Sequence, residues 1–510
     1  MRVLPRSGPP VPPLLAAALL LPALAAAQPQ PVRTTARDRV SASVTIYNRN
    51  LGLVREVREF DVPSGAVELA FEDVTTQIRP ETVHFKDLST GQPIRVLEQN
   101  YRYDILAPTS LIQRYVGRTV TLVHVVPGTG EVRRREATLL SIGDVTGATY
   151  GGGYGIGAAA DSNPWEYVYD FGGGEISFGG DWRIVVPPEI PAGFVARPTL
   201  FWELEAPAAG RRRVEASYLT HGMNWSADYV LVLAGDGAKG DLTGWVTLTN
   251  DSGITFDDAQ LKLVAGDVNI VPPAGSNFPL RAARSIVMAE QAAPSTPAFA
   301  EEGMFEYHLY TLQRPTDLRD REQKQIELLS GSGIPIERHY RLYAQPYWFV
   351  SQVNGIQENL HPDVWLEFVN AETVGLGVPL PAGTVRVYVT EAGRAGGRQF
   401  LGEDSIRHTA REERVKVRTG RAFDIVIDRR QTDYEVIGSE AVATEWELKL
   451  RNRKTTPVVV EVREPTSGDW EIVSSSLPFV KESSREVRFD VTLPPGREVV
   501  LTYRIRVKYY

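Results

Sequence analysis

The 510-residue chain contains no cysteine. Disulfide bonds, thiol nucleophiles, thiolate metal sites and lipid attachment through an N-terminal cysteine are therefore excluded. Beyond its first residues the chain also lacks a long apolar run, whereas a membrane-spanning helix needs about 20 such residues. The formal net charge is −8, and three basic residues in a row occur only at 133–135 and 211–213. We therefore expect no transmembrane segment and no nucleic-acid partner.

Several catalytic and ligand-binding signatures are missing as well. The seven histidines show no metal-ligand spacing such as H-E-x-x-H, and neither a G-x-S-x-G elbow nor a calcium loop occurs. Residues Gly153–Ala158 do satisfy the dinucleotide pattern G-x-G-x-x-A. That motif requires a buried strand before it and a helix after it, and the flanking residues favour neither. The sequence thus predicts no metal ion and no cofactor.

Residues 1–27 have the composition of a secretory signal peptide. Arg2 and Arg6 give a basic start, Val11–Leu24 is an apolar run interrupted by prolines, and three alanines end the segment. We expect cleavage after Ala27, so that the mature chain is exported to the periplasm or the extracellular space. Such a chain, without cysteine, must be stabilised by packing alone.

The clearest pattern in the rest of the chain is a set of short alternating runs, of which Ser217–Asn269 is the best example. Apolar residues at every second position, between Asn, Asp and Gly turns, are typical of half-buried strands. One pattern, an aromatic residue followed by an alternating strand and an Asn at the turn, occurs three times, in Trp245–Asn250, Trp365–Asn370 and Trp446–Asn452. We interpret each Asn as a turn residue that bonds nearby backbone and tolerates the left-handed region.

A second recurring device is an apolar residue followed by Pro, a small residue or Pro, and Gly, which is type I turn chemistry. It occurs at Val62–Gly65, Ile190–Gly193, Leu380–Gly383 and Leu493–Gly496. Together with the Trp/Asn repeat it predicts an all-β fold of tandem immunoglobulin-like β-sandwiches, with a small barrel-like insertion in the N-terminal part.

The same signals divide the chain into units. We expect a signal peptide (1–27), a linker (28–38), an N-terminal β domain (39–215) with the insertion at about 105–185, a first sandwich (216–270 plus 303–330) interrupted by an Ala/Pro-rich loop (271–302), a second sandwich (331–433) and a C-terminal sandwich (434–510).

One polar cluster within these strands could bind a ligand. A histidine and carboxylates near an aromatic side chain can hold a sugar or act as acid and base. The alternative is a strand corner at which the Trp packs in the core and the polar side chains bond backbone groups. The candidate residues are His221, Asn224, Trp225, Asp228, Asp267 and Asn269.

The C-terminal three fifths of the chain contains five distinctive segments: Tyr218–Tyr229, Gly244–Gly253, Lys262–Asn269, Gly377–Tyr388 and Gly402–Thr409. Through these segments it resembles a family of exported bacterial proteins that carry a domain of unknown function and are related to the mucoidy-inhibitor A proteins. The resemblance implies no assigned activity and no catalytic residues. Mucoidy-inhibitor A proteins look to have a long coiled coil between their two parts, and no sustained heptads occur here.

Two functions of different class remain open at this point. The first is a non-enzymatic cell-envelope protein whose sandwiches present loops to an envelope polymer or to another exported protein. The second is an envelope hydrolase acting on polysaccharide or peptide, with a site near His221 and Asp228. The second requires that these side chains converge in one concave pocket, and it fails if they point to different faces of a sheet.

Overall fold

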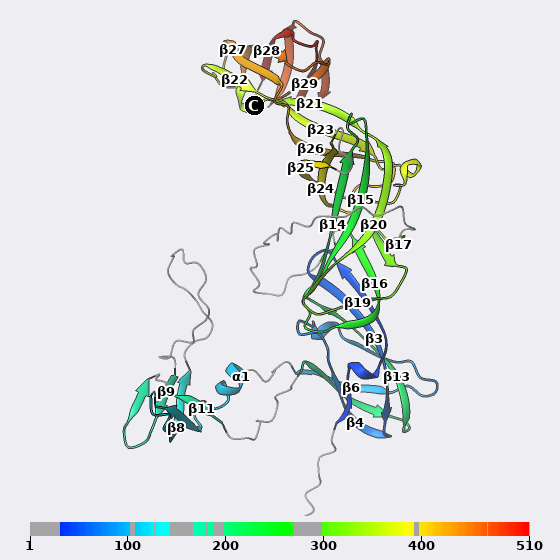
Figure 1. Ribbon diagram of the computed structural model, residues 1–510, viewed down its shortest axis with the longest axis vertical. Coiled ribbons are helices and arrows are strands. Elements are labelled where there is room, and N and C mark those ends of the chain that lie inside the picture. The colour runs from blue at the N-terminus through cyan, green and yellow to red at the C-terminus, as the bar shows by residue number, and fades with distance from the viewer. Residues whose placement is uncertain are drawn as a thin grey trace, which may run out of the picture.

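The computed structural model describes residues 31–102, 108–126, 128–142, 167–178, 182–186, 197–266, 268–269, 298–391, 397–466 and 468–508. These residues are almost entirely β structure, arranged as sandwiches that follow one another along the long axis of the molecule (Figure 1). The all-β sandwich prediction is confirmed. Four parts of the sequence interpretation lie outside the described residues: the expected signal peptide (1–27), Gly153–Ala158, Ile190–Gly193 and most of the Ala/Pro-rich loop (271–302).

Two sheets form the N-terminal end of the molecule. Sheet 1 has the order β1 (Val32–Thr34), β4 (Gly65–Glu72), β12 (Thr199–Ala206) and β6 (Arg95–Arg102). Sheet 2 has the order β17 (Phe299–Met304), β18 (Tyr307–Leu312), β16 (Phe256–Ala265), β2 (Arg39–Tyr47), β3 (Leu51–Val62), β13 (Gly210–Thr220) and β5 (His84–Asp87), and β19 (Thr316–Leu318) also pairs with β16.

The expected insertion is a separate five-stranded antiparallel sheet, which lies to one side of the row of sandwiches (Figure 1). This sheet 3 packs against the short helix α1 and has its own small core around Leu122, Leu139 and Tyr169. Its elements are α1 (Pro108–Gln113), β7 (Thr119–Val125), β8 (Val132–Ile142), β9 (Tyr167–Asp170), β10 (Ile176–Phe178) and β11 (Arg183–Val185).

Three further sheets build the middle and the C-terminal end. Sheet 4 has the order β20 (Glu322–Pro335), β15 (Lys239–Asn250), β14 (Met223–Leu233), β24 (Gly383–Thr390) and β25 (Arg398–Ile406). Sheet 5 has the order β26 (Arg414–Arg421), β23 (Asp363–Val369), β21 (Glu337–Tyr343), β29 (Val458–Pro465), β32 (Glu486–Leu493) and β31 (Val480–Ser483). Sheet 6 has the order β22 (Ile356–Leu360), β27 (Ile425–Ile437), β28 (Ala441–Asn452), β33 (Glu498–Lys508) and β30 (Asp469–Ser475). Four short 3-10 turns complete the described elements: η1 (Ala36–Asp38), η2 (Pro80–Thr82), η3 (Pro346–Phe349) and η4 (Glu372–Val374).

Sheet 5 belongs to two cores at once. Its β23 and β26 place Leu366, Phe368 and Val417 in a core that is continuous with sheets 1, 2 and 4. Its β21, β29 and β32 place Tyr340 and Val460 in a second core against sheet 6. Because one hydrogen-bonded sheet joins the two cores, the middle and C-terminal sandwiches form a continuous body.

Alternation within the strands explains how these cores form. In β14 every second residue from Met223 to Leu233 is buried, and the residues between them are exposed or half-buried. A strand with this pattern can lie only with its apolar face inward, since a shift of one residue would reverse every side chain. Each fully buried large apolar side chain contributes about 1.5–3 kcal/mol relative to its exposed state.

Candidate functional site

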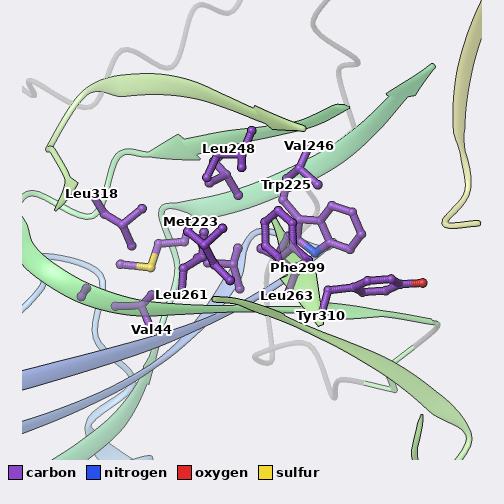
Figure 2. Close-up of a cluster of buried hydrophobic side chains, with 14 of the residues drawn as sticks. Val44, Met223, Trp225, Val246, Leu248, Leu261, Leu263, Phe299, Tyr310 and Leu318 are labelled. Carbon is purple, nitrogen blue, oxygen red and sulfur yellow. The ribbon is translucent and has the colours of Figure 1, made fainter. Parts of the chain in front are cut away.

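The structure places the predicted cluster on both faces of β14. Trp225 points into the core, where its indole Nε1 donates a hydrogen bond of 3.3 Å to the carbonyl oxygen of Val264. Figure 2 shows Trp225 among the apolar side chains of facing strands, close to Leu263 and Phe299. Asn224 and Asp228, one residue before Trp225 and three after it on the same strand, lie on the opposite, solvent-facing side.

His221 and Asn224 hold a turn rather than facing Trp225. His221 Nδ1 lies 2.9 Å from the carbonyl oxygen of Asn50, and the amide oxygen of Asn224 accepts a hydrogen bond of 3.3 Å from the Asn50 backbone N–H. Asn50 has a φ of 53°, and its own side-chain oxygen accepts a hydrogen bond of 2.9 Å from the Gly222 N–H. These three side chains therefore stabilise the left-handed turn between β2 and β3.

Asp228 is held by its neighbours in sheet 4. Its two carboxylate oxygens accept hydrogen bonds from Thr247 Oγ1 and from Arg386 Nη1, each at 2.9 Å. Asn269 is exposed beyond the end of β16, and Asp267 lies outside the described residues. The described members of the cluster thus do not converge on one pocket, and each polar side chain with a described contact bonds backbone or a strand neighbour.

An open hollow lies on the described surface of the C-terminal sandwich, lined by residues 472–479. Its lining consists of apolar and serine side chains from β30 and the turn that follows, so it contains no titratable group. A hollow of this kind has no acid or base for hydrolysis.

Sequence reasoning missed a cluster of charged side chains on the outer face of sheet 5. Glu337 and His339 lie two residues apart on β21 and therefore share a face, and Glu367 on β23 is directly opposite Glu337. One ligand atom from each of the three lies within 4.8 Å of the other two, so together they could hold a metal ion. His339 Nδ1 lies 2.7 Å from Glu461 Oε1, which leaves Nε2 directed at Glu337 Oε2, 3.6 Å away.

Cationic side chains already balance these carboxylates. Arg341 Nη2 donates to Glu367 at 2.6 Å, its Nε donates to Glu461 at 2.9 Å, and Arg414 Nη1 donates to Glu337 at 2.6 Å. Opposed carboxylates such as Glu337 and Glu367 would otherwise repel each other across the strands. A metal ion would have to displace Arg414, and we therefore interpret the cluster as an ion-pair network that joins β26, β23, β21 and β29.

The network shifts the pKa values of its carboxyl groups. Burial acts to raise the pKa of Glu461, but hydrogen bonds from Arg341 and Arg463 outweigh it and lower the pKa to about 2. A hydrogen bond from Arg414 likewise holds the pKa of Glu337 below its ordinary value. Both carboxylates are ionised at neutral pH, which strengthens the connection between the two cores that sheet 5 spans.

A second ion pair lies entirely inside the C-terminal core. Arg429 donates to both carboxylate oxygens of Glu464, at 2.8 and 3.0 Å, and also to the hydroxyl of Tyr503 at 3.0 Å. Its guanidinium lies 4.3 Å from the ring centre of Trp446 and 4.9 Å from that of Trp348. Both charges are fully buried, so this pair fixes strands β27 and β29 against each other and is inaccessible to a ligand.

Two aromatic side chains stand out on the surface instead. Phe305, at the tip of the β17–β18 hairpin, is 99% exposed and has a φ of 55°. Phe423, in the β26–β27 turn, is 82% exposed and stacks on His361 with the ring centres 5.8 Å apart. Exposed aromatic residues are enriched where proteins bind partners.

Residues 214–509 match the family described as a domain of unknown function, DUF4139. The chain belongs to the DUF4139 family. The DUF4139 match begins inside β13 and extends through sheets 4, 5 and 6, so it includes every cluster described above. No curated protein matches the chain. Among the described residues, none of the helices is long and apolar enough to cross a membrane.

Proposed function

We propose that this DUF4139 protein is an exported cell-envelope protein, related to the mucoidy-inhibitor A proteins, that acts as a non-enzymatic binding or structural module. Support for export comes from residues 1–27, with their basic start, apolar run and terminal alanines. Support for a non-enzymatic role comes from the clusters at His339 and Arg429, where carboxylates are paired with arginines that join strands. The partner is an envelope polymer or another exported protein.

The observation that carries the binding role is Phe305. A bulky residue in the left-handed region costs on the order of 1–3 kcal/mol, and leaving a phenylalanine in water forgoes the gain from burying it. The hairpin that carries Phe305 is nevertheless formed in full, with paired residues from Phe299↔Leu312 to Met304↔Tyr307. Exposed aromatic residues are enriched at interfaces, and we therefore infer that the side chain of Phe305 is buried in a complex.

The test is a pull-down from the envelope of the producing cell with the mature chain, residues 28–510, as bait. Phe305→Ser is compared with Phe423→Ser, which removes another highly exposed aromatic residue from a different part of the surface. We expect wild type and Phe423→Ser to retain the same partner and Phe305→Ser to lose it. Protease and glycosidase treatment of the captured material distinguishes a protein from a polymer.

Two results would count against this function. Equal recovery by all three baits would remove the Phe305 hairpin from the binding surface. Turnover of envelope polysaccharide or peptide by the purified mature chain would show that the protein is an enzyme, and loss of that turnover in His221→Ala would locate the site in the predicted cluster.

A further inference from the structure

The turn between η3 and β22 contains the chain's single Asn-Gly dipeptide, Asn354–Gly355. Both residues are exposed, and Gly355 adopts a φ of 83°. A Cβ built on Gly355 would have no heavy atom within 4 Å, so the turn is open around the peptide bond that joins the two residues. The side-chain amide of Asn354 is thus next to a backbone nitrogen that no side chain shields.

The fold leaves both reacting groups available. The Asn354 amide makes no hydrogen bond with any described residue, and the first residue of β22 to pair with β27 is Ile356, one position after Gly355. By contrast, the buried residues Asn250, Asn370 and Asn452 use their side-chain amides in hydrogen bonds to the backbone, which fixes each carboxamide in place. Asn354 is therefore free to rotate its carboxamide carbon toward the following nitrogen.

We propose that Asn354–Gly355 is a site of spontaneous deamidation. The deprotonated backbone nitrogen of Gly355 attacks Cγ of Asn354, so that an N–Cγ bond forms and the Cγ–Nδ2 bond breaks. The Gly355 nitrogen has lost its proton to solvent, and the leaving amide nitrogen takes up a proton from solvent and departs as ammonia. A cyclic succinimide remains. Water then opens either carbonyl of the ring, which yields aspartate or isoaspartate. The balance is one water consumed and one ammonia released for each asparagine converted.

The reaction would change the edge of sheet 6. The new carboxylate adds a negative charge to the turn, and isoaspartate also inserts a methylene into the main chain directly before β22. That strand is held by few pairs, with a register shift between Gln357 and Leu360. Gln431 stabilises the turn before β22 by two hydrogen bonds. Its side chain accepts one of 2.8 Å from the Val353 N–H and donates one of 3.1 Å to the Ser351 carbonyl. We expect the longer main chain to weaken these contacts and loosen β22.

The experiment ages the intact mature chain at neutral and at mildly alkaline pH and follows it by peptide mapping with mass spectrometry. The expected result is a mass gain at residue 354 equal to replacement of NH2 by OH, with isoaspartate detected by enzymatic methylation. The rate should rise with pH, because the deprotonated nitrogen is the nucleophile. Faster hydrogen exchange in β22 of aged protein than of fresh protein provides a second readout.

Two comparisons make the proposal falsifiable. Gly355→Ala has open space for the added methyl group but is strained at a φ of 83°, so hydrogen exchange of β22 in the fresh variant must first show that the turn is kept. In that case Gly355→Ala should slow the reaction at Asn354 several-fold by hindering the approach of the nitrogen. Asn224 is an internal control, since it is also exposed but is followed by Trp225. No mass gain at residue 354, a rate equal to that at Asn224, or an unchanged rate in Gly355→Ala would overturn the proposal.

Discussion

The three asparagines of the Trp/Asn repeat give the sharpest test of the fold. Each is buried, its Nδ2 donates to two backbone carbonyls, and its Oδ1 accepts from a backbone N–H. In Asn452 the acceptors are Thr456 O at 2.9 Å and Leu493 O at 3.0 Å, and the donor is Lys454 N at 2.9 Å. We therefore compare Asn452→Ala with Asn452→Asp. The aspartate keeps the shape of the side chain and its acceptor oxygen and removes only the Nδ2 group that donates to the two carbonyls.

These contacts predict that Asn452→Asp lowers the free energy of unfolding more than Asn452→Ala does. Alanine deletes three hydrogen bonds that contribute about 1 kcal/mol each, so the free energy of unfolding should fall by about 3 kcal/mol. Aspartate keeps the acceptor for Lys454 but aims a buried carboxylate at the carbonyl oxygens of Thr456 and Leu493. Because an unpaired buried charge costs more than a missing hydrogen bond, we expect a loss of about 5 kcal/mol or more at neutral pH.

Hydrogen exchange of β28 and β33, together with urea unfolding, measures both losses. Asn224→Ala is the matched control, since that exposed side chain makes one hydrogen bond of 3.3 Å and should cost less than about 1 kcal/mol. The buried carboxyl group that Asn452→Asp introduces should have a pKa above the ordinary aspartate value of about 3.9, so lowering the pH through that raised pKa should restore stability to this variant. Equal stability of the two variants at neutral pH would refute the assigned hydrogen-bond directions.

Three further outcomes follow from the charged networks and the sheet order. Glu461 has a folded pKa of about 2 against an ordinary 4.5, so its stabilisation is complete above pH 4.5 and is lost as the pH falls toward 2. Acid unfolding of Glu461→Gln should accordingly depend less on pH over this window than that of wild type. Arg429→Leu leaves Glu464 buried without its partner and should cost about 3–5 kcal/mol in urea unfolding, whereas Arg429→Leu with Glu464→Leu should recover most of that loss. Replacing residues 103–196 by a short Gly/Ser turn should leave the unfolding of the C-terminal core unchanged, because Arg102 and Thr199 are directly paired, whereas a fragment that starts at residue 214 should be insoluble.

Alternation in the sequence was enough to predict the strands, but the Trp/Asn repeat does not by itself say on which face of its strand each Trp lies. A strand side chain reaches the core only if it is an even number of residues from another core residue. Trp446 is six residues before the buried Asn452 and is fully buried, whereas Trp245 and Trp365 are each five residues before their Asn and are half-buried on outer faces. Counting this spacing would have separated the two cases.

The structure confirms one part of the role expected for the asparagines of the repeat, the bonds to nearby backbone, and contradicts the other, the left-handed conformation. They do bond nearby backbone, but none of the three has a positive φ, so the left-handed region is not why asparagine occupies these corners. A buried corner with two carbonyls and one N–H to satisfy needs a side chain with two donor hydrogens and an acceptor, and the carboxamide of asparagine supplies all three in less volume than that of glutamine. The sequence showed the residue without showing that its surroundings were buried.

The charged network could not be predicted, because it depends on which strands pair. The sequence shows that Glu337, His339 and Arg341 share a face, since they are two residues apart on one strand. Their partners come from far along the chain: Arg341 meets Glu367 through antiparallel pairing with β23 and Glu461 through parallel pairing with β29. Alternation within one strand carries no information about such neighbours, and only knowledge of the sheet order supplies it.

The start of the DUF4139 match at residue 214 does not coincide with a boundary of the folded body. β13 pairs with β3 along its whole length, from Gly210↔Val62 to Thr220↔Gly52, and β16 pairs in parallel with β2. A Cβ on Gly52 would lie 2.6 Å from the sulfur of Met223, so the N-terminal strands also pack closely against β14. The first core is built from both regions. The matched segment is therefore a unit of sequence, whereas the unit that folds includes the N-terminal strands that complete its sheets.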